Sequence, residues 1–348
     1  MFVLPVHCAE LGFVDLAARE AGTTVAVRGG GHNVAGSGSN DGGLVMDLKL
    51  MRGVTVDPVR ALARVQGGAT WDDIDAAAAR YGLATTGGTV GSTGVAGLTL
   101  GGGLGYLTRS LGLACDRVES YRMVTGDGRR RWIDAEHDAE LNRLLRGAGH
   151  GLGVVDEFTF RLAPVPRVYG GRFAYPLRYA TPVMAAFTEL MADTPADMTC
   201  LLMLEPWGDP AVRSVVANVF YSGGDEVVVR RIERMMACAP LTGKDFGPRS
   251  YLPMQASLGE TDFGPRHRRA GGHRRGRHPY RPGRSRHRWP ARPRVALRAP
   301  SWRSVTPPAS SARSSPPYRP GEESARLYDS IAALSAVTAF SELKRARA

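Results

Sequence analysis

Hydrophobic and polar residues alternate in recognisable elements up to about residue 264. Apolar residues at helical spacing begin at Cys8 and end at Gly22, and glycine commonly follows a helix. Thr70 is a suitable N-cap for a helix over 71–81, because Asp72 and Asp73 would place negative charge in its first turn. The pattern also predicts strands at 23–27, 44–47, 54–57, 61–65, 120–125 and 154–162, and a helix at 138–146. A turn at 126–128 predicts a further strand that returns through Trp132.

The pattern changes to longer units between residues 168 and 238. These units predict an antiparallel sheet with helices on one face. Two prolines interrupt the pattern at 164–167, so we expect a first domain over 1–166 and a second over 167–264. The strands are expected at 171–175, 199–204 and 212–221, and the helices at 182–192 and 226–236.

The basic charge of the chain lies in one segment. The formal net charge is +12, but residues 265–321 contain 16 Arg and no Lys, Asp or Glu, and the rest has 29 basic against 33 acidic residues. Residues 265–321 show no hydrophobic period, which predicts disorder, and helical spacing returns only in a short C-terminal segment over 322–348. We consider three interpretations of residues 265–321: a reading frame translated out of phase, a genuine disordered tail and a nucleic-acid-binding arm. The last is disfavoured because no folded reader motif accompanies the arginines.

Composition excludes several classes of protein. With 43% hydrophobic and 22% charged residues in 348, the chain is neither wholly disordered nor a single small module. No apolar run is long enough to cross a membrane and no secretion signal is visible, so the expected location is cytoplasmic. The four cysteines form no CxxC pair, which argues against a zinc site and against a disulfide framework.

Two glycine-dense loops are the strongest candidates for a binding site. The first reads VRGGGHN over 27–33, directly after a predicted strand, and the second runs from Gly87 to Gly105. Neither loop fits the Rossmann GxGxxG or the P-loop GxxxxGK pattern. Consecutive glycine amides can cradle a pyrophosphate, although a flexible surface turn explains the same composition.

Four segments in this order resemble the berberine bridge enzyme-like, or vanillyl-alcohol oxidase-type, FAD-linked oxidoreductases. They are VAVRGGGHNVAG (25–36), ATTGGTVGSTGVAGLTLGGGLG (84–105), LGLACDRV (111–118) and RGAGHGLGVVDEFTFRL (146–162), and the resemblance covers roughly 8–260. It implies an α+β fold, with FAD between the two subdomains of a PCMH-type FAD-binding domain and an antiparallel-sheet substrate domain over the isoalloxazine ring. That substrate domain is expected to be incomplete here.

The resemblance assigns roles to residues of both loops. It makes His32 the covalent attachment site, with an imidazole nitrogen joined to the 8α-methyl group of the flavin. Gly29, Gly30 and Gly31 would bind the pyrophosphate, flanked by Arg28 and Asn33. Val154 and Val155 would contact the adenosine. Gly88, Thr89, Gly94, Gly97, Gly101, Gly102 and Gly103 would line the second wall of the channel, although for each glycine a role in turning the chain stays open.

Some relatives carry a second covalent link through a cysteine, and the matching position here is near Val90. The chain is therefore expected to be singly linked, and Cys115 is interpreted as a small packed side chain. His150 stands where the family has glycine. The family also has some tens of residues before the position of Cys8, where this chain has seven.

The expected function is that of an FAD-dependent oxidase. It would oxidise a C–H bond next to a hydroxyl or amine of a small molecule, with dioxygen as acceptor. The family's closing base-bearing strand and YDPxNxF-like segment are not visible, so no catalytic base is predicted. Tyr106, Tyr121 and Tyr221 are phenols interpreted as packing residues. The alternatives are a flavin-binding or drug-sequestering protein without turnover, or a truncated, non-functional relative.

Overall fold

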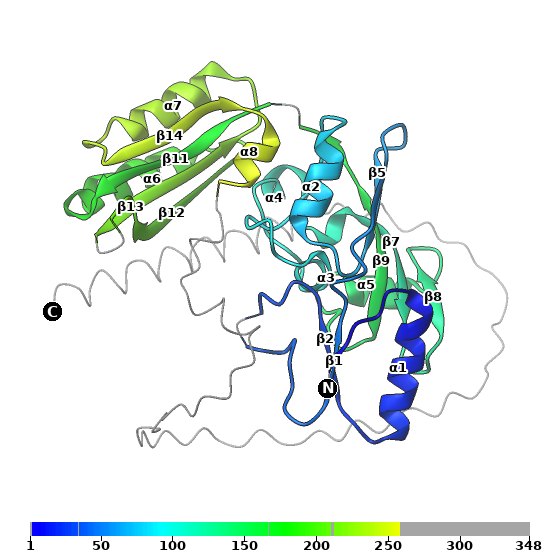
Figure 1. Cartoon of the computed structure of the whole chain (residues 1–348). Helices are drawn as coiled ribbons and strands as arrows, with labels where there is room; N and C mark the ends of the chain where they lie inside the picture. Colours follow the sequence, from blue (N-terminus) through cyan, green and yellow to red (C-terminus); the bar gives the residue numbers. More distant parts are fainter. Residues whose placement is uncertain (1, 34, 166, 210–211, 258–348) are drawn as a thin grey trace, which may run out of the picture. The chain divides into compact units, whose positions relative to one another are not determined.

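The computed structural model describes residues 2–33, 35–165, 167–209 and 212–257 (Figure 1). These residues belong to one compact unit and form three main sheets with helices packed on them. The segments predicted as a basic region at 265–321 and as a C-terminal helix at 322–348 lie outside the described residues.

The first sheet is small and carries the first glycine loop. Its three strands, β1 (Phe2–Val3), β3 (Leu44–Asp47) and β2 (Val25–Arg28), are parallel and lie in the order β1-β3-β2. Helix α1 (Cys8–Glu20) ends two residues before Gly22, as its apolar spacing predicted. The two-residue strand β1 is too short to leave a signal in the sequence.

The second sheet contains the main core of the N-terminal part. Its five antiparallel strands are ordered β4-β5-β9-β7-β8, and all five were predicted, β8 as the return strand through Trp132. Phe160 packs edge-on to Trp71 at 5.7 Å between ring centroids, and both side chains are fully buried. The strands are β4 (Val54–Asp57), β5 (Leu62–Gln66), β7 (Val118–Val124), β8 (Arg130–Ile133) and β9 (Val154–Arg161), with helices α2 (Trp71–Ala79) and α5 (Ala139–Leu145).

Helix α2 begins at the predicted cap. The backbone N–H of Thr70 donates to the Asp73 carboxylate at 2.8 Å, the reciprocal bond of a capping box. The second glycine loop was expected to be irregular throughout, but it contains helix α3 (Val95–Leu100). Gly94 and Gly101 bound this helix, and the six residues between them are mostly apolar and buried. Helix α4 (Thr108–Leu111), a 3-10 turn (Cys115–Arg117) and the strand pair β6 (Leu83–Ala84) and β10 (Ala163–Pro164) complete this part.

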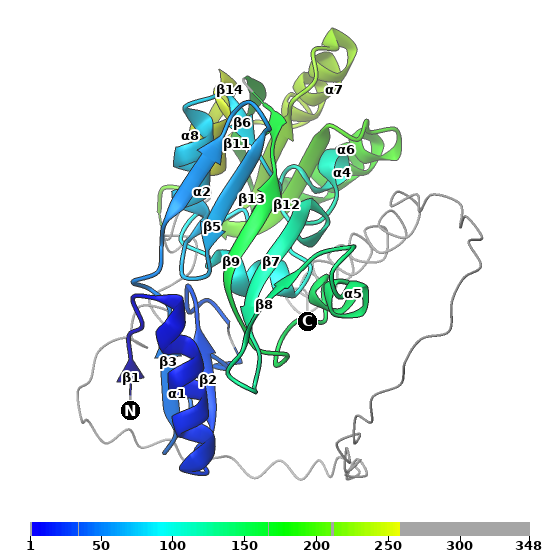
Figure 2. The same cartoon turned by 90° about the vertical axis from the view of Figure 1, so that its right-hand side faces the viewer.

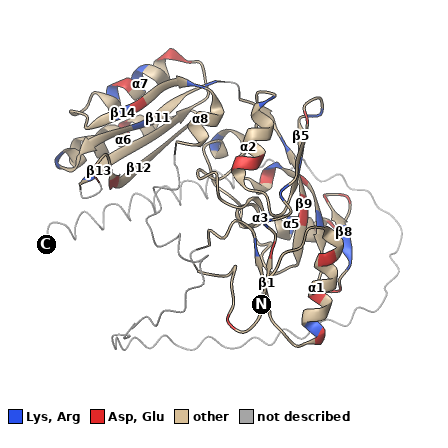
Figure 3. Cartoon of the chain, viewed as in Figure 1, with Lys and Arg blue, Asp and Glu red and all other residues tan. Residues whose placement is uncertain are grey.

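The third sheet has four antiparallel strands in the order β12-β13-β11-β14. As predicted, α6 (Ala180–Ala192) and α7 (Glu226–Met236) cover one face, and Figure 2 shows both on the same side of the strands. Figure 3 shows acidic and basic residues along α7, whereas the strands are largely uncharged. The strands are β11 (Val168–Pro176), β12 (Met198–Pro206), β13 (Arg213–Tyr221) and β14 (Gly243–Arg249), followed by helix α8 (Tyr251–Gln255).

The third sheet is larger than predicted, because β14 was not expected. Its sequence, GKDFGPR, has Phe246 as its single large apolar residue and also contains a proline. The low apolar content and the proline both argue against a strand. Pairing along β11 from Val168 to Ala174 overrides that local preference. The predicted domain boundary falls between β10 and β11 and stays a prediction, since both sides belong to the same compact unit.

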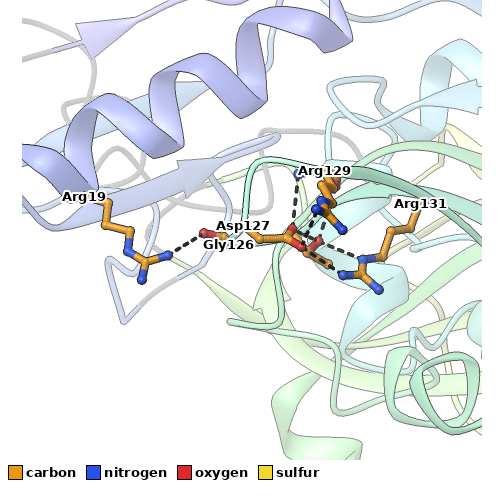
Figure 4. Close-up of polar contacts among 6 residues, drawn as sticks. Arg19, Gly126, Asp127, Arg129 and Arg131 are labelled. Atoms are coloured by element: carbon orange, nitrogen blue, oxygen red, sulfur yellow. Dashed lines mark hydrogen bonds and ion pairs between the residues drawn. The ribbon is translucent and has the colours of Figure 1, made fainter. Parts of the chain in front are cut away.

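Helix α1 joins the first sheet to the hairpin between β7 and β8. A Cβ atom added to Gly12 would lie 2.6 Å from the carbonyl oxygen of Gly128, so backbones meet there without a side chain between them. Figure 4 shows Arg19 of α1 reaching the same turn, where its guanidinium donates to the carbonyl of Gly126 at 3.3 Å. In the hairpin itself, Asp127 pairs with Arg131 at 2.9 Å.

Candidate functional site

The first glycine loop presents backbone N–H groups with no protein partner. Gly29, Gly30 and Gly31 directly follow β2, and Gly30 and Gly31 are exposed. Within the residues that the structure describes, the N–H groups of these three glycines donate to no protein acceptor. Gly31 has a φ of +73°, a conformation that side chains disfavour. Such amides need water or a ligand as their acceptor.

A positive charge lies beside these amides. The guanidinium of Arg28 lies over Gly31, with Nη2 3.0 Å from the position that a Cβ atom of Gly31 would take. In the described ranges no carboxylate pairs with this guanidinium. Amide N–H groups next to a guanidinium suit an anion such as a phosphate.

The two glycine loops meet at Gly30 and Gly94. A Cβ atom on Gly30 would lie 2.2 Å from the backbone nitrogen of Gly94, and a Cβ atom on Gly94 would lie 2.2 Å from that of Gly30. Next to this contact, Nε2 of His32 lies 3.0 Å from Oγ of Ser92. The structure therefore brings His32, 60 residues away in sequence, to the second loop.

The second loop is tightly packed around Gly87 and Gly88. A Cβ atom on Gly87 would lie 2.4 Å from the ring of Trp71, and one on Gly88 would lie 2.8 Å from Leu98. Gly105 closes the loop, since its Cβ atom would lie 1.6 Å from the carbonyl oxygen of Gly87. These glycines are needed for backbone contact within the protein.

The far end of the second loop is fixed by the segment that follows it. Gly102 and Gly103 both have positive φ, and their carbonyl groups accept hydrogen bonds from the backbone of Cys115 and Ala114 at 2.9 Å. Gly102 and Gly103 therefore turn the chain, which is the alternative to cofactor contact that the sequence left open for each glycine. Gly97 differs, because it is exposed and nothing lies within 4 Å of a Cβ atom placed on it.

Sequence comparison links these loops to flavin proteins. Residues 1–134 match the family model described as an FAD-binding domain. An FAD-linked oxidoreductase of Dictyostelium discoideum is 33% identical over 219 residues, which are 62% of this chain and 47% of that protein. The (R)-6-hydroxynicotine oxidase of Paenarthrobacter nicotinovorans is 31% identical over 269 residues, 75% of this chain and 59% of the oxidase.

Solved structures give the same result. The crystal structure of 6-hydroxy-D-nicotine oxidase from Arthrobacter nicotinovorans matches with a TM-score of 0.69 and 28% identity, over 73% of this chain and 57% of that one. The chain therefore carries an FAD-binding domain and resembles FAD-linked oxidoreductases over most of its length. Physcomitrella patens BBE-like 1 has the same fold, with a TM-score of 0.63 and 24% identity over 72% of this chain and 54% of that chain.

The match to an FAD-binding domain indicates FAD as the cofactor, and the α+β fold and the family resemblance are confirmed. The chain spans about half the length of the curated relatives it matches, between 47% and 59% for the two named above. None of the described helices is long and apolar enough to cross a membrane. Among the same residues, no group of histidine, cysteine and acidic side chains could hold a metal ion.

The geometry of the first loop fits FAD. The cofactor carries a pyrophosphate, and the loop offers unpaired N–H groups beside the Arg28 guanidinium where the two glycine loops converge. Val154 and Val155, predicted at the adenosine end, point into two different cores and are 6% and 2% exposed. They would reach a cofactor only through their backbone. Their role, and those of the half-buried Thr89 and the exposed Asn33 and Gly101, stay predictions.

The third segment of the family pattern reaches the second loop through His150. Its Nε2 atom lies 3.1 Å from the carbonyl oxygen of Gly97, and its ring lies 3.1 Å from the Cβ position of Gly101. The histidine that replaces a glycine therefore lies against two predicted cofactor residues. Cys115 is buried and burial raises the pKa of its thiol to about 11, which agrees with a packed side chain.

The three phenols named from the sequence are all buried. Tyr121 is fully buried, and burial raises the pKa of its phenol. Tyr221 accepts a hydrogen bond from the backbone of Asp225 at 2.8 Å. Tyr106 stacks on Phe220 with 5.5 Å between ring centroids. Each packs in a core, as interpreted from the sequence.

Sequence reasoning missed two buried polar groups behind the second loop. Asp75 lies in α2 with 2% exposure, and Gln255 lies in α8 with 1% exposure. Asp75 carried a usable signal, because it occupies a core position of its helix beside Ile74 and Ala78. Gln255 carried none, since its partner is 167 residues away.

Proposed function

We propose that the chain is the cofactor-binding part of an FAD-dependent oxidase, with FAD covalently attached to His32. The observation that carries this proposal is the convergence of the two glycine loops beside that histidine, with His32 Nε2 3.0 Å from Ser92 Oγ. The hydrogen bond fixes the ring next to the contact between Gly30 and Gly94. A neutral imidazole nitrogen is a competent nucleophile for such an attachment.

The residues of the first loop would hold the cofactor through its charge. The N–H groups of Gly29 to Gly31 would donate to the pyrophosphate, and the Arg28 guanidinium would neutralise part of its negative charge. Attachment would join an imidazole nitrogen of His32 to the 8α-methyl carbon. The hydrogens lost from the nitrogen and from the methyl group would pass to dioxygen, which would leave as hydrogen peroxide. Bound FAD supplies the capacity to accept a hydride from a substrate C–H bond.

The proposed substrate is a small molecule with a hydroxyl or amine next to that C–H bond. The proposed substrate-binding surface is the face of the four-stranded sheet opposite α6 and α7. There Leu201, Asn218 and Arg172 lie side by side on β12, β13 and β11. Arg172 pairs with Glu205 of β12 on this face. Asn218 is fully buried and donates to the hydroxyl of Tyr106. The pair of Arg172 and Glu205 is therefore the part of this surface that would orient a polar substrate.

The test of cofactor attachment is the colour of the protein after acid precipitation. We expect the wild-type precipitate to stay yellow, and His32→Ala to release all of its flavin into the supernatant. His137→Ala is the matched control, because His137 is an exposed histidine bonded to Asp134 in a different loop. Flavin that stays with the His32→Ala precipitate, or leaves the wild type completely, would refute covalent attachment at this residue.

Turnover separates an oxidase from a protein that only binds flavin or sequesters a ligand. A catalytic base must reach the substrate, and Tyr106, Tyr121 and Tyr221 are all buried. Their burial favours a protein that only binds flavin or sequesters a ligand. Anaerobic mixing with candidate alcohols and amines measures bleaching of the flavin absorbance. Bleaching supports the oxidase, and its absence with every candidate supports a binding function.

A further inference from the structure

A buried chain of polar groups connects the third sheet to the second glycine loop. Helix α8 follows β14 and lies against α2 (Figure 1). The side-chain amide of Gln255 in α8 donates to the backbone carbonyl of Gly88. The hydroxyl of Tyr251, one turn earlier, donates to Oε1 of Gln255 at 3.1 Å. All three residues are buried, and Gln255 is only 1% exposed.

The chemistry of these groups fixes the direction of both hydrogen bonds. A carbonyl oxygen only accepts, so the NH2 side of the Gln255 amide must face Gly88. The amide oxygen is then left to accept from Tyr251, which must donate. Burial and the nearby Asp75 raise the pKa of the Tyr251 phenol, so the hydroxyl keeps the proton that it donates. Tyr251 therefore holds the amide of Gln255 in one orientation.

Gly88 has no side chain with which to fix its own position. The ring of Trp71 and the side chain of Leu98 press on this stretch of backbone, and Gln255 provides its buried polar anchor. A buried carbonyl without a hydrogen-bond donor is unfavourable, so without Gln255 the backbone would shift to find another donor. The position of the second loop thus depends on Gln255 in α8, the helix that follows the last strand of the third sheet.

We propose that Gln255 is a positioning residue for the flavin: it fixes the backbone of Gly88 and so aligns the second loop against the cofactor. The proposal rests on the proposed function and on the family resemblance, which implies that Gly88 lines the flavin channel. It goes further, because it makes the geometry of the cofactor site depend on a residue outside the matched FAD-binding domain, which ends at residue 134.

Two substitutions of Gln255 in the full chain test this role. Gln255→Met keeps the length and removes both hydrogen bonds, and we expect a changed visible circular dichroism of the bound flavin and a shifted midpoint potential. Gln255→Glu keeps the shape. When protonated, its carboxyl group can donate to Gly88 and accept from Tyr251, but when ionised it can only accept. We expect a wild-type flavin spectrum at low pH and the Gln255→Met spectrum at high pH, with a one-proton transition in addition to the titration of nearby Asp75, which the wild type shares.

Thr199→Val is the matched control. Thr199 is 3% exposed, and its hydroxyl donates to the backbone carbonyl of Tyr106 at 2.9 Å, so it also joins the third sheet to the chain just after the second loop. We expect this variant to lower the melting temperature without changing the flavin spectrum.

Three outcomes would overturn the proposal. An unchanged flavin spectrum in both Gln255 variants, or the same spectral change in Thr199→Val, would leave Gln255 with a structural role only, while the proposed function would stand. If Gln255→Met does not fold, the pH dependence of Gln255→Glu decides alone. A wild-type protein that binds no flavin would overturn the proposed function, and this inference with it.

Discussion

The two glycine loops have similar compositions and opposite physical roles. In the first, Gly30 and Gly31 are exposed and their N–H groups have no protein acceptor in the described part of the chain. In the second, a side chain on Gly105 would collide with the backbone of Gly87, and one on Gly87 would collide with the ring of Trp71. One loop is open to a ligand, and the other is part of the protein's own packing.

This difference shows that glycine density alone does not identify a ligand site. Glycine permits close approach of any backbone, whether the approaching group is a ligand or another segment of the chain. The accessible amides of the first loop are the feature that suits a pyrophosphate. For the second loop, the ligand-facing positions must be found one by one. Exposed Gly97 can contact a ligand directly, whereas buried Gly88 can act only through the position of its backbone.

The largest effect is expected from an added methyl group where the second loop closes. In Gly105→Ala, the new Cβ atom would lie 1.6 Å from the carbonyl oxygen of Gly87, and neither backbone can move without displacing the Trp71 contact. Overpacking of this kind costs about 1–3 kcal/mol or more, and we expect the upper end of that range. Urea unfolding followed by fluorescence measures the loss.

Gly97→Ala is the control within the same loop. Gly97 lies inside α3 with nothing within 4 Å of its Cβ position, so alanine should stabilise the helix by about 0.5–1 kcal/mol. Equal losses in the two variants would contradict the packing role assigned to Gly105. Reduced flavin binding in a stable Gly97→Ala would show instead that this exposed position faces the cofactor.

A pH-dependent effect is expected from Asp75, which lies in α2 behind the second loop. Burial, with the nearby charge of Asp72, raises the pKa of its carboxyl group well above the ordinary value, so the folded protein favours the protonated form. The unfolded chain releases this proton near pH 4, and stability is then lost as pH rises until the folded carboxyl group also ionises. Within that interval, each pH unit lowers the folding equilibrium constant about tenfold.

Asp75→Asn removes this titration and keeps the shape of the side chain. We expect its melting temperature relative to the wild type to rise as the pH increases above about 4, and to level off once Asp75 ionises in the folded protein. The measurement is a series of thermal melts of both proteins in matched buffers. A difference that stays constant as the pH increases would mean that Asp75 is ionised in the folded protein, and the packing behind the second loop would then be more polar than described.

A smaller effect is expected in the first loop, where glycine relieves strain without filling space. Gly31 and Gly36 have nearly the same φ, +73° and +74°, and neither Cβ position lies within 3.0 Å of backbone. Alanine at either position should cost about 1–2 kcal/mol from the left-handed conformation alone. The two variants should therefore unfold at similar urea concentrations. Only Gly31→Ala should lower the fraction of protein that carries flavin, and an equal loss in both would argue against a pyrophosphate at Gly31.

How much could be predicted from the sequence depends on how local each feature is. Helix α1, the capped helix α2 and most strands followed from apolar spacing, caps and β-branched runs. Strand β14 did not, because its pairing with β11 overrides a sequence of Lys, Asp, Gly and Pro. For the site, family resemblance identified His32 and the glycines. Their meeting across 60 residues, and that of Gln255 with Gly88 across 167, depend on tertiary contacts that no local pattern records.

The smallest effect on stability is expected where α1 attaches the first sheet to the hairpin between β7 and β8 of the second sheet. In Arg19→Met, the exposed guanidinium loses its hydrogen bond to the Gly126 carbonyl, while the backbone contact of Gly12 with Gly128 remains (Figure 4). An exposed contact of this kind contributes little, so we expect a loss below about 0.5 kcal/mol and unchanged flavin content. Urea unfolding at low and high salt, with the flavin absorbance recorded on the same samples, measures both. A larger loss, or a loss of flavin, would show that the open geometry of the first loop is held from α1 and is not a local property of its glycines.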